Sequence, residues 1–314
     1  MRAVTIVDDK LEIREHPDPE PGTGEVLVGV RAAGLNRADL LQRVGLYPAP
    51  PGSPPDIPGM ELAGEVVAVG RNATRFGSGD RVMAVVGGGA QAELAVLHER
   101  TAMPVPPGMD WPAAGGFPEA FVTAHDALFT QCALGMGEHA LVHGAAGGVG
   151  SAAVQLAAAA GARVTATVRN PDLRDEVGAF GADQVIDPAD FVVHGPYDVV
   201  LELVGAPNMA GNLESLATGG RIVVIGVGAG SQAEIELHVL MGKRGTIRAS
   251  TLRARPLEEK ALAMRSVEAH VLPLVEAGRI RVPVEAIFPR EEAAAAYERF
   301  EAGGKFGKIV LVTS

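Results

Sequence analysis

One glycine-rich segment constrains the fold of this chain more than any other. Residues 140–162 read ALVHGAAGGVGSAAVQLAAAAGA, an apolar strand-like run followed by closely spaced glycines and an alanine-rich helical stretch. Small residues let the backbone turn sharply and approach a pyrophosphate, and the free N–H groups of the following helix can bind that anion. In the dinucleotide-binding fingerprint, Ala145 stands at the first glycine position, Gly147 at the second and Gly150 at the third. A purely structural glycine turn is the alternative for this segment taken alone.

The sequence around this segment alternates between apolar runs and helical stretches. The runs lie at 140–143, 163–168, 184–187, 198–204, 221–227 and 246–251, and helices are expected at 150–160, 171–180 and 208–216. Such alternation predicts a parallel sheet covered on both faces. Six strands at these spacings predict a doubly wound α/β domain of the Rossmann type, and this context favours the dinucleotide interpretation of the glycine turn.

The first 120 residues are richer in glycine and proline. Strand-like runs at 4–7, 25–30, 61–69, 81–86 and 91–97 predict a mostly antiparallel, barrel-like unit. The proline-rich segment Tyr47–Gly59 is expected to be a loop, and loops of this length are often functional. The C-terminal part predicts helices at 257–277 and 291–300 and a last strand at 308–312 that returns to the first unit. The predicted domains are therefore 1–119 with 254–314, and 120–253.

Composition excludes several classes of function. The chain has 314 residues, a net charge of −11 and a pI near 5.2, which argues against nucleic acid and anionic membranes as partners. The single cysteine, Cys132, excludes an intrachain disulfide and a cysteine-rich zinc cluster, and is expected to be a small buried hydrophobe. The sequence shows no signal-peptide pattern and no apolar run long enough to span a bilayer, so a cytoplasmic location is expected.

The residues after the run 163–168 indicate which dinucleotide binds. NAD-specific sites usually have an acidic residue here for the ribose hydroxyls. This chain instead has Arg169 and Asn170, and Arg174 adds a second positive charge. A guanidinium can bind a 2′-phosphate through two hydrogen bonds, so we expect NADP(H). The alternative is a solvated arginine that stacks on adenine, with two nearby aspartates weakening the positive field.

Two histidines have the spacing of a helical metal-ligand pair. On the strand expected here, the four residues from His139 to His143 span about 13 Å, so the two side chains cannot bind one ion. We expect His143 to pack near the glycine turn and His139 to lie in a turn. The sequence contains no His-Glu-x-x-His, Cys-x-x-Cys, P-loop lysine or Gly-x-Ser-x-Gly motif, so zinc proteases and serine hydrolases find no support.

Taken together, a series of segments resembles the zinc-independent branch of the medium-chain dehydrogenase/reductase superfamily. The likeness is to quinone oxidoreductases of the zeta-crystallin type, particularly the tumour-suppressor-induced subgroup. The segments are AAGLNRADLLQRVGLYPAPPG (32–52), IPGMELAGEVVAVG (57–70), GDRVMAVVGGGAQAELAV (79–96), PEAFVTAHDAL (118–128), the glycine turn, MGKRGTIRASTLRAR (241–255) and GKIVL (307–311). The resemblance implies a discontinuous GroES-like catalytic domain beside the Rossmann domain, and a homodimer joined through the strand at 246–251.

The resemblance also implies that the protein works without zinc. Zinc alcohol dehydrogenases of this superfamily have a cysteine where this chain has Asn36, a histidine where it has Met60, and a four-cysteine lobe that this chain lacks. A stable zinc site needs three or four ligands. We therefore expect Met60 to pack in the interior and Glu61 to hold loops through hydrogen bonds or an ion pair.

The same resemblance implies roles for individual residues. It places catalytic or nicotinamide-end residues at Asn36, Tyr47 and Thr123, and pyrophosphate contacts at Gly147, Gly148 and Val149 beside Ala145. It assigns Arg169, Asn170 and Arg174 to the adenosine phosphate, and it places Gly226 and Leu252 beside the cofactor. One departure is Pro188, where relatives often carry a tyrosine near the adenosine ribose.

The implied activity is hydride transfer from NADPH to a quinone or a related α,β-unsaturated carbonyl. Without a metal, catalysis rests on positioning and on hydrogen bonds to the developing oxyanion. Tyr47 is either the donor to that oxygen or an aromatic wall, Asn36 is expected to orient the cofactor, and Asp39 is expected to cap a helix or pair with an arginine. An enoyl-thioester reductase, a non-catalytic, crystallin-like NADPH-binding protein and, least favoured, a zinc alcohol dehydrogenase are the alternatives.

Overall fold

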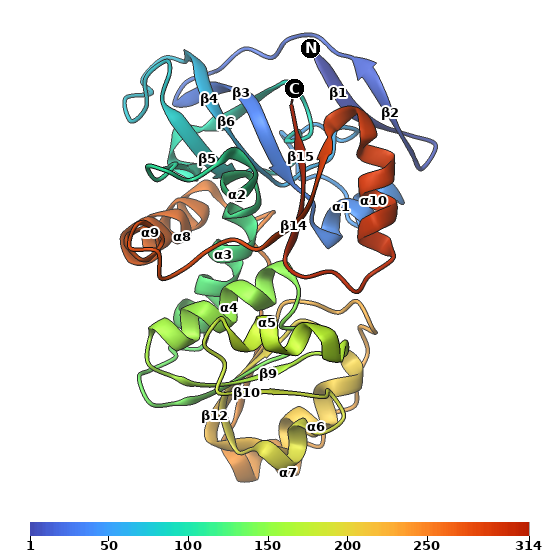
Figure 1. Cartoon of the computed structure of the whole chain (residues 1–314), viewed down its shortest axis with the longest axis vertical. Coiled ribbons are helices and arrows are strands. Elements are labelled where there is room, and N and C mark those ends of the chain that lie inside the picture. The colour runs from blue at the N-terminus through green and yellow to red at the C-terminus, as the bar shows by residue number, and fades with distance from the viewer. Residues whose placement is uncertain (314) are drawn as a thin grey trace. The chain divides into compact units, whose positions relative to one another are not determined.

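The computed structural model describes residues 1–313, which form two compact units (Figure 1). Unit 1 comprises Met1–Val122 and Leu252–Ser314, and unit 2 comprises Thr123–Thr251. The domain boundaries predicted from the sequence, at 119/120 and 253/254, lie close to these. No helix within residues 1–313 combines the length and the apolar character needed to cross a membrane.

Unit 1 is built on nine strands. They are β1 (Arg2–Val7), β2 (Lys10–Glu15), β3 (Glu25–Gly34), β4 (Glu61–Val69), β5 (Arg81–Val85), β6 (Leu94–His98), β7 (Ala102–Pro104), β14 (Val284–Pro289) and β15 (Lys308–Val312). Seven of them form one sheet in the order β14-β15-β3-β4-β5-β7, with β6 paired to β3, and β1 and β2 form a separate hairpin. All pairs except β14 with β15 are antiparallel. The mostly antiparallel unit and the return of the last strand to it are confirmed, whereas β2, β7 and β14 were not anticipated.

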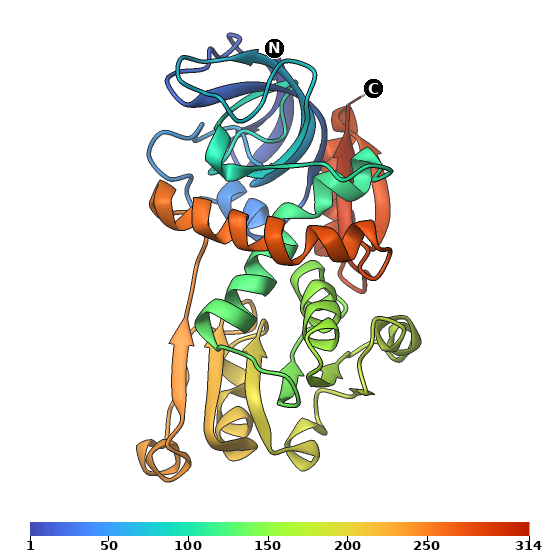
Figure 2. The same ribbon diagram turned by 90° about the vertical axis from the view of Figure 1, so that its left-hand side faces the viewer.

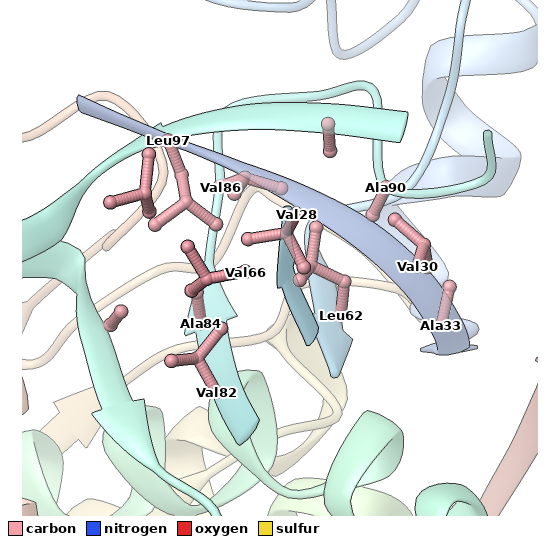
Figure 3. Close-up of a cluster of buried hydrophobic side chains, with 13 residues drawn as sticks. Val28, Val30, Ala33, Leu62, Val66, Val82, Ala84, Val86, Ala90 and Leu97 are labelled. Atoms are coloured by element: carbon pink, nitrogen blue, oxygen red, sulfur yellow. The ribbon is translucent and has the colours of Figure 1, made fainter. Parts of the chain in front are cut away.

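Small branched side chains fill the core of this sheet (Figure 3). Alternate residues of β3 point inward, as the two-residue period of a strand requires. β3 and β4, which pair antiparallel, also approach each other closely, because a Cβ on Gly64 would lie 2.1 Å from the carbonyl oxygen of Gly29. The cluster consists of Val26, Val28, Val30, Ala33, Leu62, Val66, Val82, Ala84, Val86, Ala90, Ala95, Leu97 and Ala102.

Six helices accompany these strands. They are α1 (Arg37–Arg43), α2 (Trp111–Gly116), α3 (Pro118–His125), which ends in unit 2, α8 (Leu257–His270), α9 (Leu272–Glu276) and α10 (Ala293–Glu301). The single helix expected at 257–277 is wrong: it is two helices, since Pro273 in the first turn of α9 cannot continue the hydrogen bonding of α8. The segment Tyr47–Gly59 is a loop without helix or strand, as predicted.

Unit 2 contains a six-stranded parallel sheet, whose strands lie side by side in Figure 2. They are β8 (His139–Val142), β9 (Arg163–Thr167), β10 (Gln184–Ile186), β11 (Tyr197–Glu202), β12 (Leu216–Val224) and β13 (Thr246–Ala249). The order β10-β9-β8-β11-β12-β13 reverses direction between β8 and β11, which is the switch point of a doubly wound fold. The predicted Rossmann-type sheet is therefore confirmed.

The helices of unit 2 are α4 (Gly148–Ala159), α5 (Arg174–Gly178), α6 (Met209–Glu214) and α7 (Leu237–Lys243), with a π-helical turn at Asp126–Gln131. The helix expected at 150–160 is confirmed as α4, those expected at 171–180 and 208–216 are shorter than predicted, and α7 was not anticipated. The helix expected at 171–180 begins as a 3-10 turn over Pro171–Leu173. The expectation of a turn at His139 is also wrong, because this residue is the first of β8.

Candidate functional site

The glycine turn of unit 2 connects β8 to α4 at the carboxyl end of the sheet. Gly144 has a φ of 62°, a left-handed conformation that favours glycine, and Gly147 precedes the first turn of α4. The first N–H groups of a helix lack partners within the helix, and its dipole attracts anions. The turn therefore presents backbone donors at a helix N-terminus, as a pyrophosphate site requires.

Steric contacts distinguish the glycines of this turn. A Cβ on Gly150 would lie 2.4 Å from the carbonyl oxygen of Gly144 and 2.7 Å from the Cα of Ala145, so only glycine lets the helix approach the turn. A Cβ on Gly147 would meet only the carbonyl oxygen of Gly144, at 3.4 Å, which is an ordinary van der Waals contact. Ala145 is fully buried and donates its N–H to the Thr167 carbonyl, so its methyl group packs inward. The geometry fits a bound dinucleotide.

Three polar residues follow β9, where the adenosine phosphate is expected. Arg169 is exposed, and the Asn170 side chain accepts a hydrogen bond from the Asp172 N–H at 3.1 Å. Arg174 donates to the Val168 carbonyl at 3.2 Å and pairs with Asp187 at 2.8 Å. Arg174 thus links the ends of β9 and β10.

A buried polar network holds the ends of the central strands. His143 contacts Thr167 at 3.2 Å through Nδ1 and Asn212 at 2.8 Å through Nε2. The amide of Asn212 donates to Glu202 at 2.7 Å, and Glu202 also accepts the backbone N–H groups of Val204 and Gly205. Burial lowers the pKa of His143, so the ring is neutral, donates from Nε2 to Asn212 and accepts from the Thr167 hydroxyl. His143 therefore packs beside the glycine turn, as predicted.

In unit 1, a buried ion pair forms the centre of a second polar site. The Glu61 carboxylate lies 2.5 Å from the Lys308 ammonium and accepts the side-chain amide of Asn36 at 2.9 Å and the N–H of Glu119 at 2.8 Å. The ammonium also donates to the Leu35 carbonyl and to the Asn36 side-chain oxygen, both at 2.8 Å. All three hydrogens of Lys308 are therefore used. The prediction that Glu61 holds loops is confirmed.

Two further acids are buried around this pair. Asp39 accepts the N–H of Asn36 at 2.8 Å and the N–H of Gly59 at 3.2 Å, so it caps α1 as predicted. Burial raises the pKa of Asp39 to about 6. Burial, together with the charge of Glu61, raises the pKa of Glu119 to about 8, so this side chain is a neutral acid at pH 7.

A buried arginine supports the Tyr47 loop. Arg253 is 2% exposed, and its guanidinium donates to the carbonyls of Gly87 at 2.7 Å and Tyr47 at 3.0 Å and to the Gln42 side chain at 2.5 Å. The same group lies 5.3 Å from the centre of the Tyr47 ring. Burial raises the pKa of Tyr47, so its hydroxyl keeps its proton at neutral pH.

The side chains around Glu61 do not form a set of ligands for a zinc ion. The Lys308 ammonium is bonded to both Glu61 and Asn36, where a metal bound by these side chains would have to lie. Met60 is 4% exposed and belongs to the core. Within residues 1–313, no three or more His, Cys, Asp or Glu side chains are grouped to hold a metal ion.

The predicted site residues divide between the units. Asn36, Tyr47 and Leu252 lie in unit 1, and the others lie in unit 2: Thr123 in α3, Ala145, Gly147, Gly148 and Val149 at the turn, Arg169, Asn170 and Arg174 after β9, and Gly226 after β12. The side-chain amide of Asn36 is engaged at both ends within unit 1. Cys132 is buried, and burial raises the pKa of its thiol to about 11.

Sequence reasoning missed Glu119, Arg253 and Lys308. The only local signals were a charged residue at the start of an apolar strand, GKIVL, and an acid after the proline that opens α3. Their partners lie far away in sequence, since Lys308 and Asn36 are 272 positions apart.

Comparison with known proteins places this architecture in a family. Residues 22–130 match the model of the alcohol dehydrogenase GroES-like domain, and residues 148–268 match that of the zinc-binding dehydrogenase. The chain is 33% identical to a quinone oxidoreductase of Pseudomonas aeruginosa, over 96% of this chain and 95% of the relative. It is 32% identical to an acryloyl-coenzyme A reductase of Metallosphaera sedula over the full length of both.

Solved structures agree with this assignment. An alcohol dehydrogenase superfamily protein from Novosphingobium aromaticivorans superposes with a TM-score of 0.89 at 27% identity, covering all of both chains. With both domain models matched in order and a relative above 30% identity along nearly the whole length, the chain belongs to the quinone oxidoreductase family of the medium-chain dehydrogenase/reductase superfamily.

Proposed function

We propose that the protein reduces quinones or related α,β-unsaturated carbonyls with NADPH, by hydride transfer without a metal ion. The observation that carries the metal-free part is the Lys308 ammonium bonded to Glu61 and Asn36 at the polar centre of unit 1. The similarity to quinone oxidoreductases supports the acceptor class.

NADP(H), when bound, supplies the hydride. The backbone of Gly147, Gly148 and Val149 would hold its pyrophosphate at the N-terminus of α4. Arg169 and Asn170 would bind the 2′-phosphate, because no carboxylate follows β9 directly and the Arg169 guanidinium is exposed. Arg174, already bonded to Asp187 and Val168, would position the ends of the two strands beneath them.

Tyr47 is the proposed proton donor to the acceptor oxygen. As an acceptor carbon gains hydride, negative charge develops on the conjugated oxygen, and a hydrogen-bond donor placed there stabilises that charge. Tyr47 is half-buried and protonated at neutral pH, and Arg253 fixes the backbone beneath its ring. Asn36 and Thr123 are proposed to orient the nicotinamide end, with Gly226 and Leu252 flanking it.

A steady-state panel tests this function. The purified enzyme is offered small ortho- and para-quinones, enones and enoyl-thioesters, each with NADPH and with NADH. We expect turnover of quinones or enones with a preference for NADPH. Equal rates with NADPH and NADH would refute the proposal that Arg169 binds the 2′-phosphate. Turnover of thioesters alone would refute the assignment of quinones as acceptors.

The second candidate is an enoyl-thioester reductase. The full-length similarity to the acryloyl-coenzyme A reductase favours it, and the thioester arm of the panel decides between the two. Tight NADPH binding without turnover of any acceptor would instead indicate the non-catalytic, crystallin-like alternative.

We also propose that the protein is a homodimer joined through β13. This strand is the edge of the six-stranded sheet, and its side chains are largely exposed. An exposed strand edge presents unpaired backbone groups that a second copy can cover. Light scattering on the purified protein gives the oligomeric state. The cytoplasmic location stays a prediction.

A further inference from the structure

Glu202 ends β11 in unit 2 and holds the loop that follows this strand. Its side chain is fully buried, and the Oε1 atom accepts the backbone N–H groups of Val204 at 2.6 Å and Gly205 at 2.8 Å. The Oε2 atom accepts the side-chain amide of Asn212, in α6, at 2.7 Å. A carboxylate is buried at tolerable cost only where hydrogen-bond donors compensate it, and here the loop supplies two of them. The side chain of Glu202 therefore fixes the path of residues 203–205.

The loop after β12 is joined to the same residue. The backbone carbonyl of Glu202 accepts the N–H groups of Ile225 at 2.9 Å and Gly226 at 3.1 Å. Two further backbone hydrogen bonds, each 2.9 Å long, connect residues 204–206 with residues 229–230. The loops after β11 and β12 are therefore one hydrogen-bonded unit, and Glu202 contributes to it through both its backbone and its side chain.

Glycines allow these loops to lie against each other. A Cβ on Gly205, whose φ is 119°, would lie 2.5 Å from the carbonyl oxygen of Gly230. A Cβ on Gly226 would lie 2.4 Å from the carbonyl oxygen of Leu203. The glycine turn after β8 is adjacent, since a Cβ on Gly144 would lie 3.7 Å from the Leu203 side chain. The loops after β8, β11 and β12 thus lie together at the carboxyl edge of the sheet.

The switch point of the sheet indicates which half of a dinucleotide these loops face. In this fold a dinucleotide lies across the crevice where the strand order reverses, here between β8 and β11, with its pyrophosphate at the turn after β8. The residue that recognises the adenosine ribose follows the next strand on one side, which is β9. The nicotinamide half therefore extends to the other side, toward β11 and β12, where Glu202 joins the two loops.

We propose that Glu202 is a positioning residue: it holds the loops after β11 and β12 in the arrangement that binds the nicotinamide half of NADPH, whereas the adenosine half binds independently of it. This inference rests on the cofactor part of the proposed function. It gives Glu202 neither a contact with the cofactor nor a proton transfer, because both carboxylate oxygens are bonded within unit 2.

Binding of a truncated cofactor tests the proposal without turnover. The probe 2′-phospho-ADP keeps the adenosine, the 2′-phosphate and the pyrophosphate of NADPH but lacks the nicotinamide and its ribose. The Kd of 2′-phospho-ADP divided by the Kd of NADPH, both measured by calorimetry, gives the contribution of the nicotinamide half. Glu202→Met keeps the side-chain length but leaves buried N–H groups unpaired, so it should lower this ratio about tenfold or more and change the Kd of 2′-phospho-ADP less than about twofold. Equal weakening of both ligands overturns the proposal.

Glu202→Gln is the conservative variant. Its amide oxygen can accept the N–H groups of Val204 and Gly205, as the Oε1 atom of glutamate does. A flip of the Asn212 amide, with the other tautomer of the neutral His143 ring, gives the new NH2 group an acceptor. This variant should therefore keep the wild-type ratio of the two Kd values. If it loses the ratio to the same extent as Glu202→Met, hydrogen bonding is not the cause and the proposal is overturned.

Two further variants separate positioning from general stability. Asp198→Asn is the matched control: Asp198 lies at the other end of β11 and accepts the N–H of His139 at 2.8 Å, so its replacement should leave the ratio unchanged. A fall as large as that in Glu202→Met overturns the proposal. If Glu202→Met does not fold, Gly205→Ala carries the test, because its Cβ forces the loop after β12 away while Glu202 stays. It should lower the ratio in the same way, and an unchanged ratio overturns the proposal.

The failure of this inference and that of the proposed function are distinguishable. If the ratio falls selectively in Glu202→Met but no quinone, enone or thioester is reduced, the role of Glu202 stands and the proposed catalysis fails. If acceptors are reduced with NADPH while Glu202→Met weakens both ligands equally, the catalysis stands and Glu202 has no positioning role. A wild-type protein that binds neither ligand overturns both.

Discussion

Replacing Lys308 by methionine should strongly destabilise unit 1. Methionine keeps most of the side-chain length but removes the ammonium, which makes three short contacts: 2.5 Å to Glu61, 2.8 Å to the Leu35 carbonyl and 2.8 Å to the Asn36 side chain. Both members of the ion pair are almost inaccessible to water, with side-chain exposures of 4% for Lys308 and 0% for Glu61. The variant therefore leaves a carboxylate buried beside two amide donors and no cation.

The magnitude follows from that burial. Removing one partner of a buried ion pair costs about 3–5 kcal/mol, because the remaining charge is uncompensated. That is a large part of the ~5–15 kcal/mol by which a typical domain is stable. Most of the loss belongs to the stranded charge and not to the pair itself, so the double variant Lys308→Met with Glu61→Gln should recover a large share of it.

Urea unfolding followed by Trp111 fluorescence measures the effect. Trp111 is the only tryptophan and lies in α2 of unit 1, with the Arg81 guanidinium 4.0 Å from its ring centre, so its emission reports this unit. Arg100→Met, which breaks the exposed pair with Glu258, is the control and should change stability little. A loss below about 1 kcal/mol in Lys308→Met, or no recovery in the double variant, would refute the reasoning.

Three further predictions concern the cofactor and the acceptor. Arg169→Ala should lower kcat/KM for NADPH about 10- to 100-fold while sparing NADH, whereas the exposed Arg71→Ala should change neither; equal losses with both cofactors would contradict the 2′-phosphate role. Tyr47→Phe should lower kcat about 100-fold or more if the hydroxyl is the donor, and unchanged kinetics would make the ring a wall. Gly150→Ala should destabilise the fold by about 1–3 kcal/mol, because its Cβ would meet backbone at 2.4 Å, whereas Gly147→Ala should spare stability and weaken NADPH binding, both measured by thermal shift with and without cofactor. If the Gly147→Ala variant binds NADPH normally, the proposal that this turn binds the pyrophosphate is refuted.

The parallel sheet could be predicted from the sequence because its central strands β8, β9 and β11 are compact runs buried on both faces. Such burial leaves no alternation to misread, and the glycine turn fixes where the first strand ends. Helix ends were less predictable, as α5 and α9 show, because a helix of five residues contains barely more than one turn of periodic signal.

The polar centre of unit 1 could not be predicted, since its contacts are not local. Glu61 and Glu119 are 58 positions apart, and Gln42 and Arg253 are 211 apart. Only the pairing of β15 with β3 brings Lys308 beside Asn36, and no periodicity within either segment encodes that pairing. The comparison with zinc enzymes indicated correctly that Glu61 ties segments together, but it gave no sign of the ammonium that completes the site.

The Lys308 ammonium and the protonated Glu119 both lower the net negative charge of one buried cluster of carboxyl groups. Three carboxyl groups, those of Asp39, Glu61 and Glu119, are buried together, and Lys308 is bonded to only one of them. Burial raises the pKa of the other two; Glu119, at about 8, keeps its proton at pH 7, whereas Asp39, at about 6, is largely ionised. A divalent ion entering here would meet the fixed charge of Lys308 and would have to displace it from Glu61. At this polar centre the positive charge that faces Glu61 is therefore that of Lys308, which also holds the Asn36 side chain.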